Sequence, residues 1–235
     1  MPDARANRQR AREVQSGATR AAVLGISDGL VTNVALILGV AGAQAEGKFV
    51  LLAGLASLVA GAASMAVGEY VSMAAQVELL QRLLGDYREH LKRAPEQARE
   101  ELEEFIQRGG VRQATAHNAS HQIALVPDRA LAVYARSLGL NPDELGSPGR
   151  AAATSLITFA AGAAVPLVPW FVWSGGRAAA ASILLGALAA VGVGALLGWL
   201  GGRNVLSSAA RQVFVLGAAA GATWGAGRLF NVTVS

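Results

Sequence analysis

The chain has 235 residues, of which 53% are hydrophobic and only 15% charged, and it contains 28 glycines but no cysteine. This composition departs from the soluble average toward that of membrane proteins. The lack of cysteine excludes a disulfide scaffold, a thiolate metal site and a cysteine nucleophile. The isoelectric point near 10.1 is explained by basic residues beside apolar segments, where they anchor a membrane protein, so we predict no nucleic-acid partner.

Five apolar segments are long enough to cross a bilayer, which takes about 20 residues of helix. They cover residues 21–43, 50–76, 151–173, 178–200 and 212–230. The charges gather between the second and third segments, where 77–150 holds 21 of the 36 charged side chains. We therefore predict an all-α polytopic membrane protein with a basic arm at 1–20, transmembrane helices 1 and 2 in 21–76, a helical insertion at 77–150 and transmembrane helices 3 to 5 in 151–235.

The distribution of Lys and Arg predicts the orientation of these spans. Arginines cluster in the arm at 1–20 and in the loop at 201–211, whereas the turns at 44–49 and 174–177 hold one cation each. By the positive-inside rule, the N-terminus and the insertion are expected to be cytoplasmic and the C-terminus outside. The arm shows no signal-peptide cleavage site and no sorting signal is evident, so we expect a bacterial plasma membrane.

Glycines recur at helical spacing in several of these spans. Examples are Gly25 with Gly29 and the run Gly217, Gly221 and Gly225. Stripes of this kind let helix backbones approach closely in lipid. Packing within the chain is the interpretation that we prefer for them, and a dimer interface is the alternative.

Two carboxylates are the only acids inside the predicted spans. Asp28 lies about seven residues inside the cytoplasmic start of the first span, and Glu69 about seven residues before the second span ends on the same side. A buried ionised carboxylate costs several kcal/mol, so it is expected to face a partner, water or a cation. The two helices are predicted to present both acids to one cation; the alternative is that each reaches the interface or pairs with a residue such as Arg20.

Two methionines lie on the same face of the second span as Glu69. Met65, Glu69 and Met73 stand at i, i+4 and i+8, which places them on one helix face. A thioether beside a carboxylate suits a borderline divalent transition metal better than Na⁺, K⁺ or Ca²⁺. Methionine in an apolar helix also occurs simply as packing.

The two motifs that contain these residues resemble the vacuolar iron transporter family. They read SDGLVTN at 27–33, followed by LGVAG at 38–42, and SMAVGEYVS at 64–72. The similarity continues through GAAVPLVP at 162–169 and, more loosely, to 225–230.

The resemblance implies a homodimeric exporter that carries Fe²⁺, often also Mn²⁺, out of the cytosol in exchange for protons. It assigns Asp28 and Met65 to the translocation path and Glu69 to the acid of the Gly-Glu-Tyr motif. Thr32, Asn33 and Met73 are predicted to line the path in a secondary role. The metal is the transported substrate, so no permanently bound cofactor is expected.

Family members with a metal-binding insertion carry glutamate pairs on its first two helices and a Met-Met-Glu cluster on its third. Here a second helix is predicted from Pro95 to a stop at Gly109, and a third over 127–138 ending at Gly139. The third helix has Val133, Tyr134 and Ser137 where the resemblance implies the ligands. The acids that remain as candidate cytoplasmic ligands are Glu89, Glu100, Glu101 and Glu104.

Several charged and histidine residues of the insertion can be interpreted either as metal ligands or as ordinary surface residues. Glu89 lies near Lys92 at a spacing typical of a salt-bridged, solvated helix. His117 and His121 stand at i and i+4 in a stretch of weak helical character, which would suit a metal, but they lack a third ligand nearby in sequence. We interpret them, and His90, as exposed histidines.

The sequence predicts a proton-coupled exporter of divalent transition metals, and it contains no motif of a hydrolase or nucleotide-binding enzyme, so no enzyme activity is expected. The alternative is a metal-responsive or structural membrane protein that keeps the fold without efficient transport. That alternative needs a working site in the insertion, whereas transport needs the intramembrane acids Asp28 and Glu69.

Overall fold

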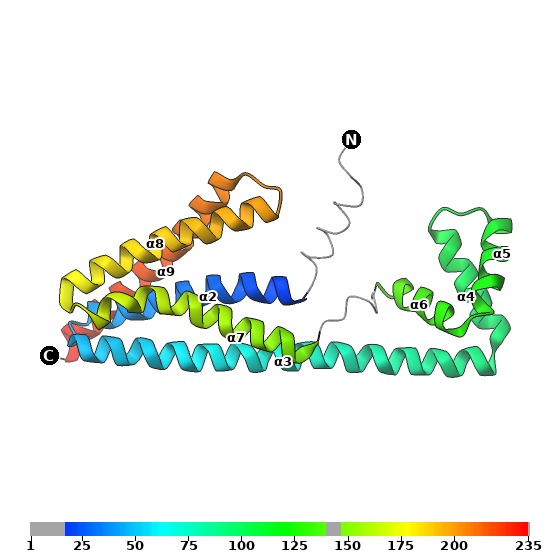
Figure 1. Ribbon diagram of the computed structural model, residues 1–235, viewed down its shortest axis with the longest axis horizontal. Helices are drawn as coiled ribbons and strands as arrows, with labels where there is room; N and C mark the ends of the chain where they lie inside the picture. The colour runs from blue at the N-terminus through cyan, green and yellow to red at the C-terminus, as the bar shows by residue number, and fades with distance from the viewer. Residues whose placement is uncertain (1–16, 140–146, 235) are drawn as a thin grey trace. The chain divides into compact units, whose positions relative to one another are not determined.

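The computed structural model describes residues 17–139 and 147–234, with side chains at 21–139 and 147–230. Every regular element in this part of the chain is a helix (Figure 1). Five of the helices are long and apolar enough to cross a membrane: Ala21–Gly42, Gly47–Arg93, Pro148–Phe171, Gly175–Leu200 and Val205–Phe230. The predicted all-α fold with five spans is therefore confirmed. The arginines of the arm at 1–16 and the side chain of Arg20 lie outside the described residues.

The chain divides into two compact units. The first comprises Met1–Val71 and Gly146–Ser235, and the second comprises Ser72–Leu145, where the sequence predicted an insertion at 77–150. Helix α3 (Gly47–Arg93) contributes to both units, because the division falls after Val71.

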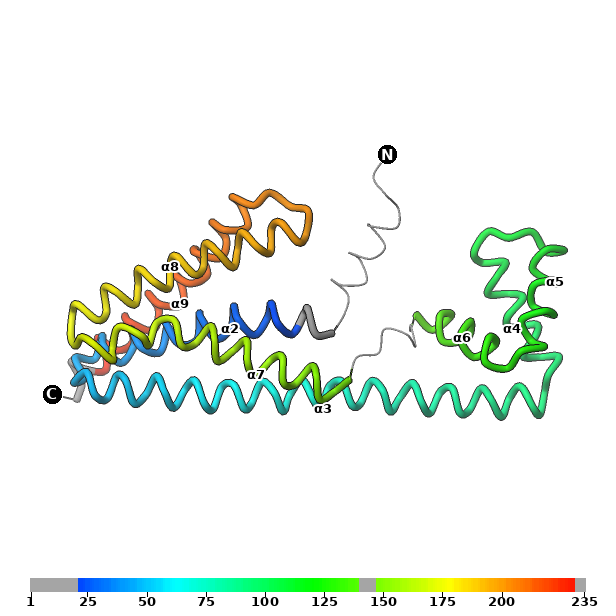
Figure 2. The backbone as a smooth tube through the Cα atoms, in the orientation of Figure 1, coloured from blue at the N-terminus to red at the C-terminus, as the bar shows by residue number. Residues whose placement is uncertain are grey.

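Helix α3 differs from the predicted second span in length. The span was expected at 50–76, but the helix runs without a break to Arg93, as the backbone trace shows (Figure 2). Proline is absent from this stretch, and the residue before a proline disfavours the helical region, so the helix ends just ahead of Ala94 and Pro95. The hydropathy of the sequence therefore predicted the apolar half of α3 but not its C-terminal end.

The first unit is built around helix α2 (Gly17–Gly42). Helix α2 packs on α7 (Pro148–Ala164), α8 (Gly175–Leu200) and α9 (Val205–Val234), which flank it in Figure 1. Its buried core with α8 and α9 consists of Leu30, Val34, Leu38, Ala190 and Leu216. A second cluster, formed by Ile37, Val50, Leu167, Trp170 and Ala178, joins α2 to the start of α3 and to the segment after α7.

The third span changes geometry where a continuous α-helix was predicted over 151–173. Helix α7 ends at Ala164, and the span continues as a 3₁₀ helix, η2 (Val165–Phe171), which contains Pro166 and Pro169. Pro169 has no N–H to donate to the Pro166 carbonyl. Ser182 of α8 donates to that carbonyl instead, at 2.7 Å, and the indole N–H of Trp170 donates to Ser182 at 2.9 Å. In lipid such a freed carbonyl needs an internal partner, and here it has one.

The glycine stripes behave in two ways. A side chain at Gly25 or Gly29 of α2, or at Gly162 of α7, would collide with the facing helix, so these stripes serve packing as predicted. On α9, a Cβ added at Gly217, Gly221 or Gly225 would meet nothing within 4 Å, so packing within the chain does not account for that run.

The second unit contains the end of α3 together with α4 (Pro95–Arg108), α5 (Gln113–Ala124) and α6 (Pro127–Ser137). Helix α4 begins at Pro95 and stops at Gly109 as predicted, and Gly139 after α6 has a left-handed φ of 74°. Helix α5 was predicted only weakly, and it is a regular helix of 12 residues. The core of this unit consists of Tyr87, Ala98 and Leu131.

Candidate functional site

Helix α2 is covered on three sides and open on the fourth. Gly25, Gly29 and Asn33 face α7, Val34 and Leu38 face α8 and α9, and Ser27 accepts a hydrogen bond from Gln212 of α9. The residues left exposed on the remaining side are Leu24, Asp28 and Thr32, which follow one another at a spacing of four. The sequence therefore folds so that the acid of the first span lies on the uncovered face of the most heavily packed helix.

Asp28 keeps its carboxylate exposed and has one neighbour on its own helix. The Thr32 hydroxyl donates to Asp28 Oδ1 at 3.2 Å. A carboxylate on an uncovered face of a membrane-spanning helix is costly unless a cation, water or another chain covers it.

Helix α3 of the first unit is buried along one face only. Gly54 meets Leu167, Gly61 meets the Phe159 ring, and Met65 packs beside the same ring in a cluster with Ala62. Glu69, one turn beyond Met65, is partly buried on that face. The opposite face exposes large apolar side chains, namely Leu52, Val59, Val67 and Val71.

Two of the residues predicted in a secondary role have different surroundings. Asn33 is fully buried, and its amide nitrogen donates to the Ala163 carbonyl of α7 at 2.6 Å. In the described residues its Oδ1 has no hydrogen-bond partner. Asn33 thus joins α2 to α7 and does not lie on the open face beside Asp28. Met73 is also buried, and it belongs to the second unit.

Most of the candidate ligands in the insertion lie beside basic side chains. Glu89 pairs with Lys92 at 2.9 Å, Glu101 lies 3.4 Å from His90, and Glu104 pairs with Arg108 at 2.6 Å. The pKa of Glu89 is lowered by its hydrogen bond and charge interaction with Lys92. Glu100 is exposed.

The third helix of the insertion uses its central residue for packing. The Tyr134 ring stacks on Tyr87 of α3 with centroids 3.7 Å apart. Burial, reinforced by the negative charge of Glu101, raises the pKa of Tyr87 to about 12, so its hydroxyl stays protonated and donates to the Ala98 carbonyl at 3.2 Å. Aromatic packing therefore occupies Tyr134, one of the three positions where the resemblance implied metal ligands.

A polar cluster between α4 and α5 was missed by sequence reasoning. His117 Nδ1 lies 2.9 Å from Glu103 Oε2, and the Arg99 guanidinium lies 3.7 Å from the same carboxylate oxygen. His117 was interpreted as a solvent-exposed residue, and its side chain is half exposed while making this contact. The signal available in the sequence was only the Arg99 to Glu103 spacing of four.

Within the two described ranges, no three His, Asp or Glu side chains come together closely enough to hold a metal ion. The predicted pathway residues Asp28, Met65 and Glu69 lie on two helices, α2 and α3. The carboxylates of Asp28 and Glu69 have the chemistry to bind a cation.

Comparison with known proteins gives a consistent result. Residues 19–228 match the VIT family. "Vacuolar iron transporter homolog 1" from Oryza sativa subsp. japonica is 34% identical over 219 residues, covering 91% of this chain and 74% of the relative. "Vacuolar iron transporter" from Acanthamoeba castellanii is 33% identical over 85% of this chain and 73% of the relative. "Vacuolar iron transporter 1" from Eucalyptus grandis is 28% identical over 86% of this chain and 82% of the relative.

Proposed function

Because the chain belongs to the VIT family, we propose that it transports metal, and specifically that it exports Fe²⁺, and also Mn²⁺, from the cytosol in exchange for protons. The matched relatives are named as transporters, which agrees with the prediction that the chain is not an enzyme. The observation that carries the proposal is Asp28, an acid on the one uncovered face of a membrane-spanning helix.

The chemistry of the three pathway residues supports a divalent transition metal as substrate. Asp28 and Glu69 supply charge and oxygen ligands, which compensate the desolvation of a cation in the membrane. Met65 adds a soft thioether, which favours a borderline transition metal such as Fe²⁺ over Ca²⁺. Carboxylates that release a metal ion are free to take up protons, and this gives the return half of an exchange cycle.

We also propose that the functional unit is a homodimer in which Asp28 and Glu69 of both copies line one central path. A single chain supplies two intramembrane acids, and a two-fold assembly supplies four. The uncovered residues Asp28 and Thr32 on α2, together with the apolar face of α3, offer surface for a second copy. In this arrangement the N-terminus and the insertion are cytoplasmic, following the distribution of basic residues.

Reconstituted protein tests the transport proposal directly. Proteoliposomes holding the full chain are expected to move Fe²⁺ and Mn²⁺ faster when a pH gradient is imposed, and to move protons in the opposite direction, because the two fluxes are coupled. A fluorescent metal indicator and a pH dye inside the vesicles report both fluxes. Liposomes without protein and a Ca²⁺ challenge are the controls. The proposal would be contradicted if neither Fe²⁺ nor Mn²⁺ moved, or if Ca²⁺ moved as fast as they do.

Single-cysteine crosslinking tests the dimer, since the native chain has no cysteine. Thr32→Cys is expected to crosslink to its own copy in membranes, because a residue near a two-fold axis meets its equivalent. Leu184→Cys on α8 and Phe214→Cys on α9 are matched controls, since both positions are exposed. Gel mobility after mild oxidation gives the readout. Crosslinking at the α8 and α9 positions with none at Thr32 would refute the central path.

A further inference from the structure

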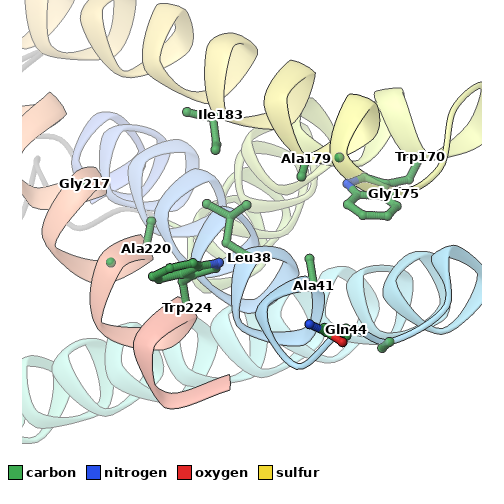
Figure 3. A pocket seen from close by; sticks show the side chains of 13 residues that line it. Leu38, Ala41, Gln44, Trp170, Gly175, Ala179, Ile183, Gly217, Ala220 and Trp224 are labelled. Atoms are coloured by element: carbon green, nitrogen blue, oxygen red, sulfur yellow. The ribbon is translucent and has the colours of Figure 1, made fainter. Parts of the chain in front are cut away.

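A cavity of about 720 Å³ lies among α2, α8 and α9, and Asp28 is not among the residues that line it (Figure 3). Its walls are almost entirely apolar, and they include Leu38, Trp170, Ile183 and Trp224. The volume falls within the range of about 300–1,000 Å³ that is usual for small-molecule sites. Gln44, in the turn after α2, is the polar residue at its margin.

Two glycines of α9 line the cavity. A Cβ added at Gly217 or Gly221 of α9 would meet nothing within 4 Å, whereas Gly227 of the same helix lies against the Gly39 carbonyl. The first two therefore do not serve close packing with α2, α7 or α8. They leave a furrow along α9 that is open at Ile183 and Trp224, whose side chains are 51% and 46% exposed.

The cavity begins near the ends of α8 and α9 and extends along both helices toward the middle of the membrane. It extends along α9 from Trp224 to Gly217 and along α8 from Gly175 to Ile183, which at 1.5 Å per residue corresponds to roughly 10 and 12 Å. One leaflet of the hydrocarbon core is about 15 Å thick. The length of the cavity along both helices therefore fits an acyl chain that enters from the membrane surface.

A cation stands one turn beyond the mouth of the cavity. Arg228 places its guanidinium 4.9 Å from the centre of the Trp224 ring. The chain has no Asp or Glu after Glu144, so α8 and α9 offer no carboxylate to neutralise this charge. Tryptophan and arginine at the end of a span sit at the level of the lipid headgroups, and guanidinium binds phosphate through two parallel hydrogen bonds.

We propose that this cavity is a phospholipid site, in which one acyl chain occupies the furrow over Gly217 and Gly221 and the headgroup phosphate binds Arg228. The site is separate from Asp28, Met65 and Glu69, so it does not depend on the transport proposal. Phosphate and acyl chain together define the ligand, because the apolar furrow and the cation lie in line along α9.

Native mass spectrometry of the full-length protein in detergent, titrated with dioleoylphosphatidylglycerol, tests the site. We expect one tightly held lipid per chain. A Cβ added at Gly221 meets nothing within 4 Å, so Gly221→Leu is expected to place its side chain in the furrow and to weaken binding at least about tenfold. Gly192→Leu on α8 is the matched control, since that glycine also has open space and lies outside the cavity.

Arg228→Gln tests the headgroup contact at an exposed position where the fold is not at risk. It is expected to weaken phosphatidylglycerol about fivefold or more while leaving dioleoylglycerol, which has no phosphate, unchanged. Arg203→Gln in the loop before α9 is the control. Equal affinity of the wild type and Gly221→Leu, or equal loss of both lipids in Arg228→Gln, would overturn the assignment. So would a disulfide between two copies of Ile183→Cys, because a second chain would then cover the furrow.

Discussion

Asp28→Asn is expected to reduce Fe²⁺ and Mn²⁺ flux in proteoliposomes at least about a hundredfold while leaving folding unchanged. The amide keeps the shape of the side chain and can still accept the hydrogen bond from Thr32, but it no longer carries charge. Asp28 is exposed on the uncovered face of α2, so the substitution is not expected to disturb the packing of the described helices. Glu69→Gln removes the second charge of the same path and is expected to have an effect of similar size.

The control for these variants is a carboxylate outside the path. Glu46 lies in the turn between α2 and α3, where it pairs with Lys48 at 2.7 Å and both side chains are largely exposed. Glu46→Gln is expected to transport like the wild type, since surface pairs of this kind contribute little. Size-exclusion profiles of all three variants report whether assembly is preserved. Normal flux in Asp28→Asn and Glu69→Gln would remove both acids from the pathway.

The spans were predictable because membrane helices depend on apolar length, which is a local property of the sequence. The ends of the spans depend on other features and were less well predicted. Helix α3 continues through Gln76 because hydropathy changes there while helix propensity does not. The third span tightens at Val165 because two prolines interrupt its hydrogen bonding, and its pairing with Ser182 of α8 is a long-range contact.

The acids of the candidate site were also predictable, because charged residues are rare inside membranes and stand out without structural knowledge. Their surroundings were not. Asn33 is one residue from the SDGLVT stretch that holds Asp28 and Thr32, yet it faces α7, since a step of one residue turns a helix by about 100°. The contact of His117 with Glu103 depends on how α5 folds back on α4, and this is not encoded in residue spacing.

The orientation of Asp28 depends on how closely α2 approaches α7, and this gives a second large expected effect. A Cβ at Gly29 would strike the Phe159 carbonyl, and one at Gly162 would strike the Ile26 carbonyl, so each helix needs glycine opposite the backbone of the other. Gly29→Ala and Gly162→Ala are each expected to cost at least about 3 kcal/mol, since backbone cannot move aside as a side chain can. The amount of folded protein and its Tm in detergent measure the loss.

Gly192→Ala and Gly225→Ala provide matched controls, because an added Cβ at either helical position meets nothing within 4 Å. Alanine is a better helix former than glycine by about 1 kcal/mol, so these variants are expected to equal or exceed the wild type in Tm. The contrast matters for function as well as stability. If α2 moved off α7 to admit a methyl group, Asn33 would lose its bond to the Ala163 carbonyl, and α2 could turn and carry Asp28 away from its open face. A Tm for Gly29→Ala equal to that of Gly192→Ala would show that the α2–α7 contact is looser than the structure describes.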